Sequence, residues 1–323
     1  MGGGLITLED LANYTVKERA ILKAEVLGYE ILTMPPPSSG GLVLIQVLKV
    51  LASVDLRSLG HNSAQYIHHL VESFKHAFAD RAKAMGDPDF VALDHNRFIS
   101  PQAIEHIRKQ FDRTKTHPSN RYGERVHSGS DGGTSHLSTL DQFGNAVALT
   151  TTVNTGFGSR FVAGKTGIIL NNQMDDFVAR PGVPNSFGLI GEKANAIEPN
   201  KRPLSSMSPT ILLKSGQPVM VVGASGGPMI ISATLQVMLN IIVFGMKPDA
   251  AVRAQRIHHQ WMPNHIWLEP GISKQLRKAL EGLGHTLKER KRFSAAQVIT
   301  RTDGAVSGAA DPSKGGSAEL ATP

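Results

Sequence analysis

Two alternating segments joined by a short turn, residues 134–140 and 146–153, are the feature that most constrains this fold. In both segments polar and apolar residues alternate with a period of two, which places one set of side chains on each face of a strand. The intervening DQFGN is rich in turn-forming residues. The pattern predicts a β-hairpin, and therefore antiparallel pairing in this part of the chain.

Helical periodicity dominates the chain before the hairpin, at residues 42–54 and 63–84. Ser38 or Ser39 is expected to cap the first of these helices, and Thr7 begins a sequence resembling a capping box. Beyond the hairpin we expect strands at 167–170, 211–213, 219–222 and 297–301, helices at 229–244 and 273–282, and a hairpin turn at Gly304. This order of elements predicts an α+β fold in which antiparallel sheets are layered with helices.

The composition is that of a globular protein, with 41% hydrophobic and 19% charged residues among 323. The densest basic segment, KERKR at 288–292, lacks interleaved aromatic residues, so we expect no nucleic-acid binding despite the net charge of +7. No apolar run reaches the roughly 18 residues that a membrane span needs. The chain has no cysteine, which excludes disulfides, thiolate metal sites and a cysteine nucleophile.

His68, Glu72 and His76 share one helical face at four-residue steps, a spacing that suits a metal ion. No further ligand is obvious, and the same residues suit the polar edge of an amphipathic helix. We prefer this second interpretation and predict no metal site.

The segment GASGG, residues 223–227, lies between an apolar strand and a long helix. It satisfies the G-x-S-x-G pattern of a serine nucleophile elbow, with Ser225 as nucleophile and Asp249 and His258 or His259 following in order. That elbow needs a parallel sheet, which the hairpin-rich sequence does not predict. We favour an anion-binding turn whose glycine amides form an oxyanion hole; a tight turn without a ligand is the simpler alternative.

Thr134 follows two glycines and a polar segment, residues 112–133, that we expect to be exposed, mobile and easily cut. A threonine hydroxyl needs an adjacent base, and cleavage before Thr134 would free an α-amine with a reference pKa of about 7.7–8.0. Gly133 would leave its own carbonyl, next to Thr134, sterically open.

Three further groups of polar residues could bind a ligand, although strand, loop and turn preferences also explain them. They are Thr150, Thr152 and Asn154; residues 171–176; and residues 202–209.

Taken in order, GGTSHLSTLDQFGNAVALTTTVNT, GIILNNQMDDF, PNKRPLSSMSPT, GASGG and RIHHQW resemble the motifs of γ-glutamyltransferases, members of the N-terminal-nucleophile hydrolase superfamily. PPPSSGG and FADRAKAMGDPDF resemble the end of that family's large subunit. The resemblance implies a four-layer αββα sandwich. Residues 1–133 would be the C-terminal part of the large subunit, with a mobile linker at 112–133, and residues 134–323 the small catalytic subunit. Because the family's large subunit is longer, we expect this chain to lack its usual N-terminal part.

By the same resemblance the chain cleaves itself between Gly133 and Thr134, and Thr134 is the nucleophile. Thr152 would hydrogen-bond that nucleophile, and the Gly226 and Gly227 amides would form the oxyanion hole. The resemblance assigns the donor's α-amino group to Asn154, Gln173 and Asp176, its α-carboxylate to Ser205 and Ser206, and a covering lid to residues 177–192. Three departures from the family pattern are Ser135 for a common threonine, Phe187 for the lid tyrosine of some bacterial relatives, and no counterpart of an upstream arginine that binds the α-carboxylate.

The implied activity is that of a γ-glutamyltransferase or glutathione hydrolase. Thr134 would take the γ-glutamyl group from glutathione or a similar donor as an ester, and pass it to water or to an amino-acid or dipeptide acceptor. The two subunits of one precursor would form a heterodimer without a metal or organic cofactor, in the periplasm or outside the cell. Two alternatives stay open: a catalytically incompetent truncated homologue, and an acylase of the same superfamily.

Overall fold

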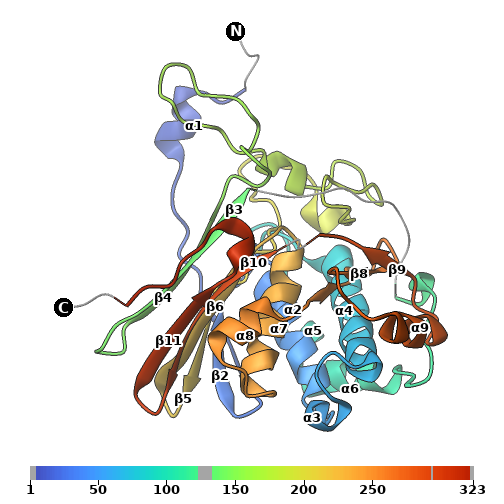
Figure 1. Ribbon diagram of the computed structural model, residues 1–323. Helices are drawn as coiled ribbons and strands as arrows, with labels where there is room; N and C mark the ends of the chain where they lie inside the picture. The colour runs from blue at the N-terminus through green and yellow to red at the C-terminus, as the bar shows by residue number, and fades with distance from the viewer. Residues whose placement is uncertain (1–4, 123–132, 292–293, 321–323) are drawn as a thin grey trace.

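A six-stranded antiparallel sheet forms the centre of the protein in the computed structural model, which describes residues 5–122, 133–291 and 294–320 (Figure 1). The strand order is β1-β2-β5-β6-β10-β11. The strands are β1 (Leu22–Val26), β2 (Tyr29–Thr33), β5 (Thr210–Lys214), β6 (Gln217–Ser225), β10 (Ala295–Thr302) and β11 (Ala305–Ala310). Strands from before and after the hairpin pair directly in this sheet, so the two halves of the chain share one core.

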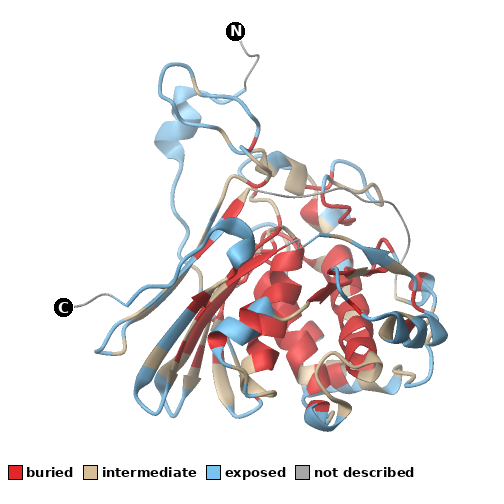
Figure 2. Ribbon diagram, viewed as in Figure 1, coloured by how far each residue is buried: buried red, intermediate tan, exposed pale blue. Residues whose placement is uncertain are grey.

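Helices cover one face of this sheet (Figure 1). Three long ones lie deepest, and Figure 2 shows that most of their surface is buried: α2 (Gly40–Leu51), α4 (Ala64–Ala84) and α7 (Met229–Ile242). Around them lie α3 (Leu56–Leu59), α5 (Asn96–Ile99), α6 (Pro101–Lys109), α8 (Pro248–Arg253), α9 (Lys274–Gly282) and a small sheet of β7 (Ile257–His258), β8 (Ile266–Leu268) and β9 (Leu287–Glu289). Eleven of the twelve residues of α2 are buried, as expected of a helix enclosed by its neighbours.

The predicted hairpin is β3 (Thr134–Leu140) paired with β4 (Ala146–Thr152), and it lies on the other side of the central sheet (Figure 1). His136 on its inner face packs against Gly223 of β6, where a Cβ atom would lie only 2.3 Å from the imidazole. Its outer face exposes about half of Leu137, Val147 and Leu149. Within the described residues the chain therefore provides three of the four expected layers: helices, central sheet and hairpin.

Most element predictions are confirmed, including the hairpin turn at Gly304 and the capping box at Thr7, which begins α1 (Leu8–Asn13). One is wrong: residues 167–170 do not form a strand, and only Ile169 makes an isolated bridge, to Val162. Of the two serines expected to cap α2, Ser38 accepts a hydrogen bond from the Gly40 amide at 3.3 Å, whereas the Ser39 hydroxyl donates to Ser205 O. None of the described helices is long and apolar enough to cross a membrane.

The polar segment ahead of Thr134 is described up to residue 122, and six of residues 112–122 are exposed as predicted. Thr116 and Tyr122 both donate hydrogen bonds to the carboxylate of Glu72 on α4, and the Trp261 indole donates to Ser119 O at 2.9 Å. Buried polar partners therefore hold a segment whose composition suggested solvent exposure. Residues 123–132, the rest of the expected linker before Gly133, lie outside the described residues.

His68 and Glu72 on α4 are buried, so the polar edge expected of an amphipathic helix faces the protein interior here. His68 Nδ1 lies 2.7 Å from His285 Nε2, and Glu72 lies near both, with one potential ligand atom of each residue within 4.8 Å of the others. The ammonium of Lys75, 3.0 Å from Glu72 Oε1, already compensates the carboxylate charge. His76 packs against the ring of Tyr122 instead. The cluster is a hydrogen-bonded network with its own cation.

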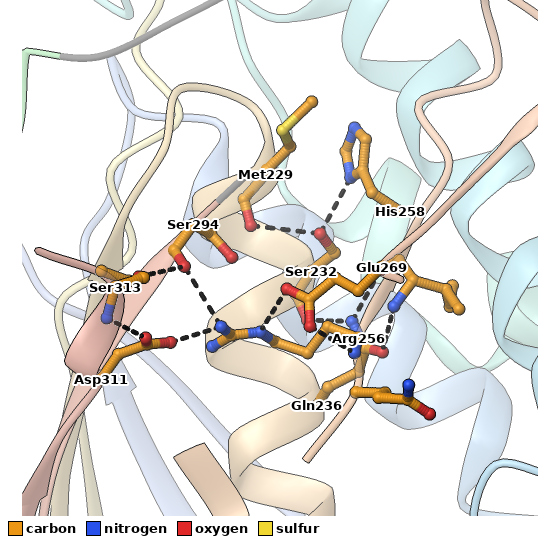
Figure 3. A network of polar contacts seen from close by, with 12 residues as sticks. Met229, Ser232, Gln236, Arg256, His258, Glu269, Ser294, Asp311 and Ser313 are labelled. Atoms are coloured by element: carbon orange, nitrogen blue, oxygen red, sulfur yellow. Dashed lines mark hydrogen bonds and ion pairs between the residues drawn. The ribbon is translucent and has the colours of Figure 1, made fainter. Parts of the chain in front are cut away.

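A second buried network surrounds Arg256, beside α7 (Figure 3). The Arg256 guanidinium forms ion pairs with Glu269 and Asp311 and donates to Ser294 O at 3.1 Å. A buried arginine is tolerated when carboxylates compensate its charge, as Glu269 and Asp311 do here. The network joins β7, β8 and the end of β11 across the core.

Buried histidines should make folding stability depend on pH. Burial lowers the pKa of five imidazoles from 6.5 to about 4, or to about 3 for His285: His76, His136, His258, His265 and His285. The unfolded chain takes up protons near pH 6.5, whereas the folded chain does so only near pH 4. Stability is therefore complete above pH 6.5 and falls as the pH drops from about 6.5 to 4.

We expect the thermal unfolding midpoint, followed by circular dichroism, to decrease steadily over that interval. His265→Gln should make the decrease shallower, because it removes one of the five groups. A midpoint that is constant from pH 7 to pH 4.5 would contradict this explanation.

Candidate active site

Thr134 and Thr152 face each other where the hairpin begins and ends, because the register pairs the first residue of β3 with the last of β4. Their hydroxyl oxygens are 2.8 Å apart. Thr152 Oγ1 also donates to Gly133 O at 3.4 Å and accepts from the Asn154 amide at 2.8 Å. With the Thr152 proton directed to Gly133 O, the Thr134 hydroxyl is the donor in the contact between the two threonines.

The Gly133–Thr134 junction continues the hairpin ladder by one residue. The Gly133 amide donates to Asn154 O at 3.1 Å, and Gly133 O accepts from the Val153 amide at 3.2 Å. A Cβ atom at Gly133 would lie 1.9 Å from Thr155 O, which only a glycine avoids. The carbonyl carbon next to Thr134 is thus held in a fixed orientation, with hydrogen-bond donors on its oxygen.

Asn154 occupies a left-handed backbone conformation, with φ of 77°. Asparagine tolerates this region better than most residues do. This explains why an asparagine, which is uncommon in strands, stands just after β4. Its side-chain amide donates to Asn172 O at 3.3 Å. The turn directs the chain away from the hairpin and brings residues 171–176 to the same place.

A single pocket brings together eight of the nine residues predicted to act in catalysis or donor binding, and they come from four separate segments. It is lined by Thr134, Thr152, Asn154, Gln173, Asp176, Ser205, Ser206 and Gly227, with Phe187, Leu189, Met207, Pro228 and Ile230 as its apolar part. Gly226 is the ninth candidate and does not line the pocket. Phe187 and Leu189 belong to the expected lid, residues 177–192, so that segment does border the site.

The GASGG turn links β6 to α7 through Gly226 and Gly227, whose φ values of 134° and 55° suit glycine. Within the described part of the chain, neither of these amides donates a hydrogen bond to another residue. Both precede the N-terminus of a 14-residue helix, where the helix dipole favours negative charge. The turn therefore offers free donors to an anion at the edge of the pocket.

Ser225 does not meet the partners that a serine hydrolase would need. It is buried, and its hydroxyl makes a long contact of 3.5 Å with Ala295 O. The imidazole of His258 bonds Ser232 and Gln260, and Asp249 pairs with Arg253 on α8. The antiparallel β6 and these separate partnerships exclude the nucleophile elbow.

Replacement of Ser225 by alanine is accordingly expected to leave both chain cleavage and γ-glutamyl anilide turnover within about threefold of the unchanged protein, since only a weak hydrogen bond is lost. Intact mass and the rate of anilide hydrolysis measure the two effects. A thousandfold loss of turnover in a correctly folded variant would restore Ser225 as a candidate nucleophile.

Three residues near the site were not predicted. Lys314 Nζ donates to Thr134 O at 3.3 Å, and Ser39 and Arg81 lie behind Ser205. Ser39 and Arg81 belong to PPPSSGG and FADRAKAMGDPDF. These motifs resemble the end of the family's large subunit, and the resemblance assigns no site residue to them. Their position next to the site depends on how α2 and α4 pack, which no local pattern indicates.

The sequence pattern of the Gamma-glutamyltranspeptidase family matches residues 1–321. The chain belongs to this family. It is 44% identical over 313 residues to the glutathione hydrolase proenzyme of Escherichia coli, an alignment that covers 96% of this chain and 54% of the relative. The chain spans about half the length of the curated relatives it matches.

Solved structures show the same fold. A γ-glutamyltranspeptidase variant from Helicobacter pylori is 42% identical and superposes on 55% of this chain and 98% of its own chain with a TM-score of 0.53. A cephalosporin acylase from Bacillus halodurans is 26% identical, with a TM-score of 0.79 over 96% of this chain and 54% of its own. The α+β fold is therefore that of an N-terminal-nucleophile hydrolase.

Proposed function

We propose that this protein is a self-cleaving γ-glutamyltransferase and glutathione hydrolase with Thr134 as its nucleophile. The observation that carries the proposal is the 2.8 Å contact between the Thr134 and Thr152 hydroxyls at a junction whose carbonyl is held by the Thr152 hydroxyl and the Val153 amide. Membership of the Gamma-glutamyltranspeptidase family supports it, as do relatives named glutathione hydrolase.

Self-cleavage would begin when Thr134 Oγ1 attacks the Gly133 carbonyl carbon. The C–N bond then breaks, an ester forms and the amide nitrogen becomes the Thr134 α-amine. Water hydrolyses the ester, which releases the Gly133 carboxylate and restores the hydroxyl. The Thr152 hydroxyl and the Val153 amide stabilise the negative charge on the Gly133 oxygen during the attack.

In the cleaved protein the Thr134 hydroxyl would attack the γ-carbonyl carbon of the donor, and its own α-amine would accept the proton. The Gly226 and Gly227 amides would stabilise the resulting oxyanion, because free donors at a helix N-terminus are prearranged for it. The donor's amide bond breaks and its amine leaves with the proton. Water or an acceptor amine then attacks the ester and frees Thr134.

The rest of the pocket suits the two ends of the donor. Asp176 supplies a carboxylate for the α-ammonium group, and Asn154 and Gln173 supply amide oxygens. Ser205 and Ser206 supply hydroxyls for the α-carboxylate. Glutathione, other γ-glutamyl compounds and amino-acid or dipeptide acceptors are the ligands we propose.

An acylase with a glutaryl substrate is the second candidate, and the cephalosporin acylase neighbour is the observation that favours it. At 26% identity this neighbour supports it weakly. A glutaryl group lacks the α-amino group, so Asp176 would have no counterpart in that substrate. We therefore prefer the γ-glutamyl donor.

The heterodimer of residues 1–133 and 134–323 and a location in the periplasm or outside the cell belong to the same proposal. Strand β5 of the second part pairs with β2 of the first in the central sheet, which supports subunits that stay together after cleavage. Gel filtration after cleavage tests the assembly, and osmotic-shock fractionation tests the location.

The deciding experiment combines N-terminal sequencing of the purified 323-residue chain with turnover of γ-glutamyl-p-nitroanilide. We expect a fragment beginning at Thr134 and release of p-nitroaniline that rises when glycylglycine is added as acceptor. A folded chain, shown by cooperative thermal unfolding, that stays uncut and inactive would overturn the proposal in favour of a catalytically incompetent homologue. Preference for glutaryl-p-nitroanilide would favour the acylase.

A further inference from the structure

The described residues that line the pocket include a carboxylate but no cationic side chain. Asp176 is the charged residue among the described residues that line it, and no lysine or arginine is among them. A γ-glutamyl donor carries an α-ammonium and an α-carboxylate on one carbon atom. The Asp176 carboxylate attracts the ammonium and repels the carboxylate, so a positive charge near Asp176 favours binding of the whole head group.

Arg81 in the last turn of α4 supplies one just behind the pocket wall. It is only 4% exposed, and it lines an adjoining cavity that shares Asp176 and Leu189 with the active-site pocket. Burial lowers the pKa of Arg81 and the negative charge of Asp176 raises it, which leaves the pKa at about 10. The guanidinium is thus positively charged at neutral pH.

Arg81 is also connected to the serines of the pocket. Its Nε–H donates to Ser39 Oγ at 2.9 Å, and because arginine is only a donor, the Ser39 hydroxyl must direct its own proton elsewhere. That proton goes to Ser205 O, at 2.8 Å, and the Ser39 amide donates to the same oxygen at 2.9 Å. Arg81 therefore fixes the direction of the hydroxyl that holds the Ser205 backbone.

We propose that Arg81 is a positioning and specificity residue for the donor, pairing its charge with Asp176 so that the subsite recognises a zwitterionic head group. This inference rests on the proposed function. The Arg81 charge compensates Asp176 and favours the α-carboxylate, while the Ser39 bridge keeps Ser205 in place to receive it. Arg81 acts from behind the wall and does not line the pocket itself.

The test compares two donors on the full chain: γ-glutamyl-p-nitroanilide, and 4-aminobutyryl-p-nitroanilide, which keeps the ammonium group and lacks the α-carboxylate. Arg81→Gln should lower kcat/KM for the first donor by about tenfold or more, mainly through KM, and leave the second within about threefold. Arg81→Lys retains the charge and should recover most of the difference between donors. A loss of structure alone would reduce turnover of both donors alike.

Arg256→Lys is the matched control, because Arg256 is a second buried arginine with its own carboxylate partners (Figure 3). It should lower the unfolding temperature and leave the ratio between the two donors unchanged. If Arg81→Gln is not recovered folded, Ser39→Ala replaces it as the test. This variant removes the hydroxyl bridge between Arg81 and Ser205, and should lower the ratio of kcat/KM between the γ-glutamyl and the 4-aminobutyryl donor severalfold.

An unchanged donor ratio in Arg81→Gln, or in Ser39→Ala where that variant decides, overturns the role of Arg81 provided the unchanged protein is active. If the unchanged protein neither cleaves itself nor releases p-nitroaniline, the proposed function itself has failed. The two failures are therefore distinguishable.

Discussion

Replacement of Thr134 by alanine is expected to leave the chain uncut at Gly133–Thr134 and to reduce γ-glutamyl anilide turnover by about a thousandfold or more. The substitution removes the hydroxyl that lies 2.8 Å from Thr152 Oγ1 at the start of β3 and keeps the Cβ atom. The same oxygen serves both reactions, so both should be lost together. Intact mass of the purified chain and release of p-nitroaniline measure them.

Thr134→Ser is the rescue variant, because serine retains the hydroxyl and should restore both reactions to within about tenfold. Thr139→Ala is the matched control, since Thr139 lies on the same strand but is exposed to solvent. It should leave cleavage and turnover unchanged. A fragment beginning at residue 134 in Thr134→Ala would show that another group cleaves the chain, and the nucleophile assignment would be wrong.

Replacement of Gly133 by alanine should slow self-cleavage by about a hundredfold or more while leaving the cleaved enzyme almost unaffected. The new Cβ atom would lie 1.9 Å from Thr155 O and 2.5 Å from Thr155 C, so the backbone must move. That movement would turn the Gly133 carbonyl away from Thr134 and from the Val153 amide. A small misplacement of a reacting group typically slows a reaction by about a hundredfold. Cleavage is followed by mass spectrometry over time after synthesis of the chain.

Gly156→Ala is the matched control, because a Cβ atom there meets no atom within 4 Å. It carries the same change two residues beyond Asn154 and should cleave at the unchanged rate. Once cleaved, Gly133→Ala should turn over γ-glutamyl anilide normally per active site, since residue 133 then belongs to the other fragment. Equal cleavage rates for the two variants would show that the junction does not depend on its backbone orientation.

The hairpin shows what the local sequence pattern can predict. The alternation from Thr134 to Leu140 and from Ala146 to Val153 predicted both strands, and their register follows once the turn is known, since each residue has a defined partner across the ladder. Residues 167–170 show where it fails. Four apolar and small residues suit a strand, but without a neighbouring strand to pair with they form only an isolated bridge at Ile169.

The candidate site was reached from the sequence mainly through motif resemblance, and eight of the nine candidates line one pocket. Their roles in catalysis and binding are still predictions. For residues 112–122 composition predicted the exposure of Arg113, Thr114 and Lys115. It did not predict the contacts of Thr116, Ser119 and Tyr122 with buried partners on α4 and at Trp261. Polar residues give no sign of exposure when their partners come from distant segments.

The sequence alone determined the hairpin, the three long helices α2, α4 and α7, the glycine turn before α7 and the glycine–threonine junction at the start of β3, because each depends on neighbours a few residues away. Only the tertiary structure decided that Arg81 lies behind Asp176 and Ser205, and that the polar face of α4 is buried with its own lysine. The contacts of Arg81 with Ser39 and of His68 with His285 join residues 42 and 217 positions apart. Their energies depend on burial and on charges from other elements, which no local pattern contains.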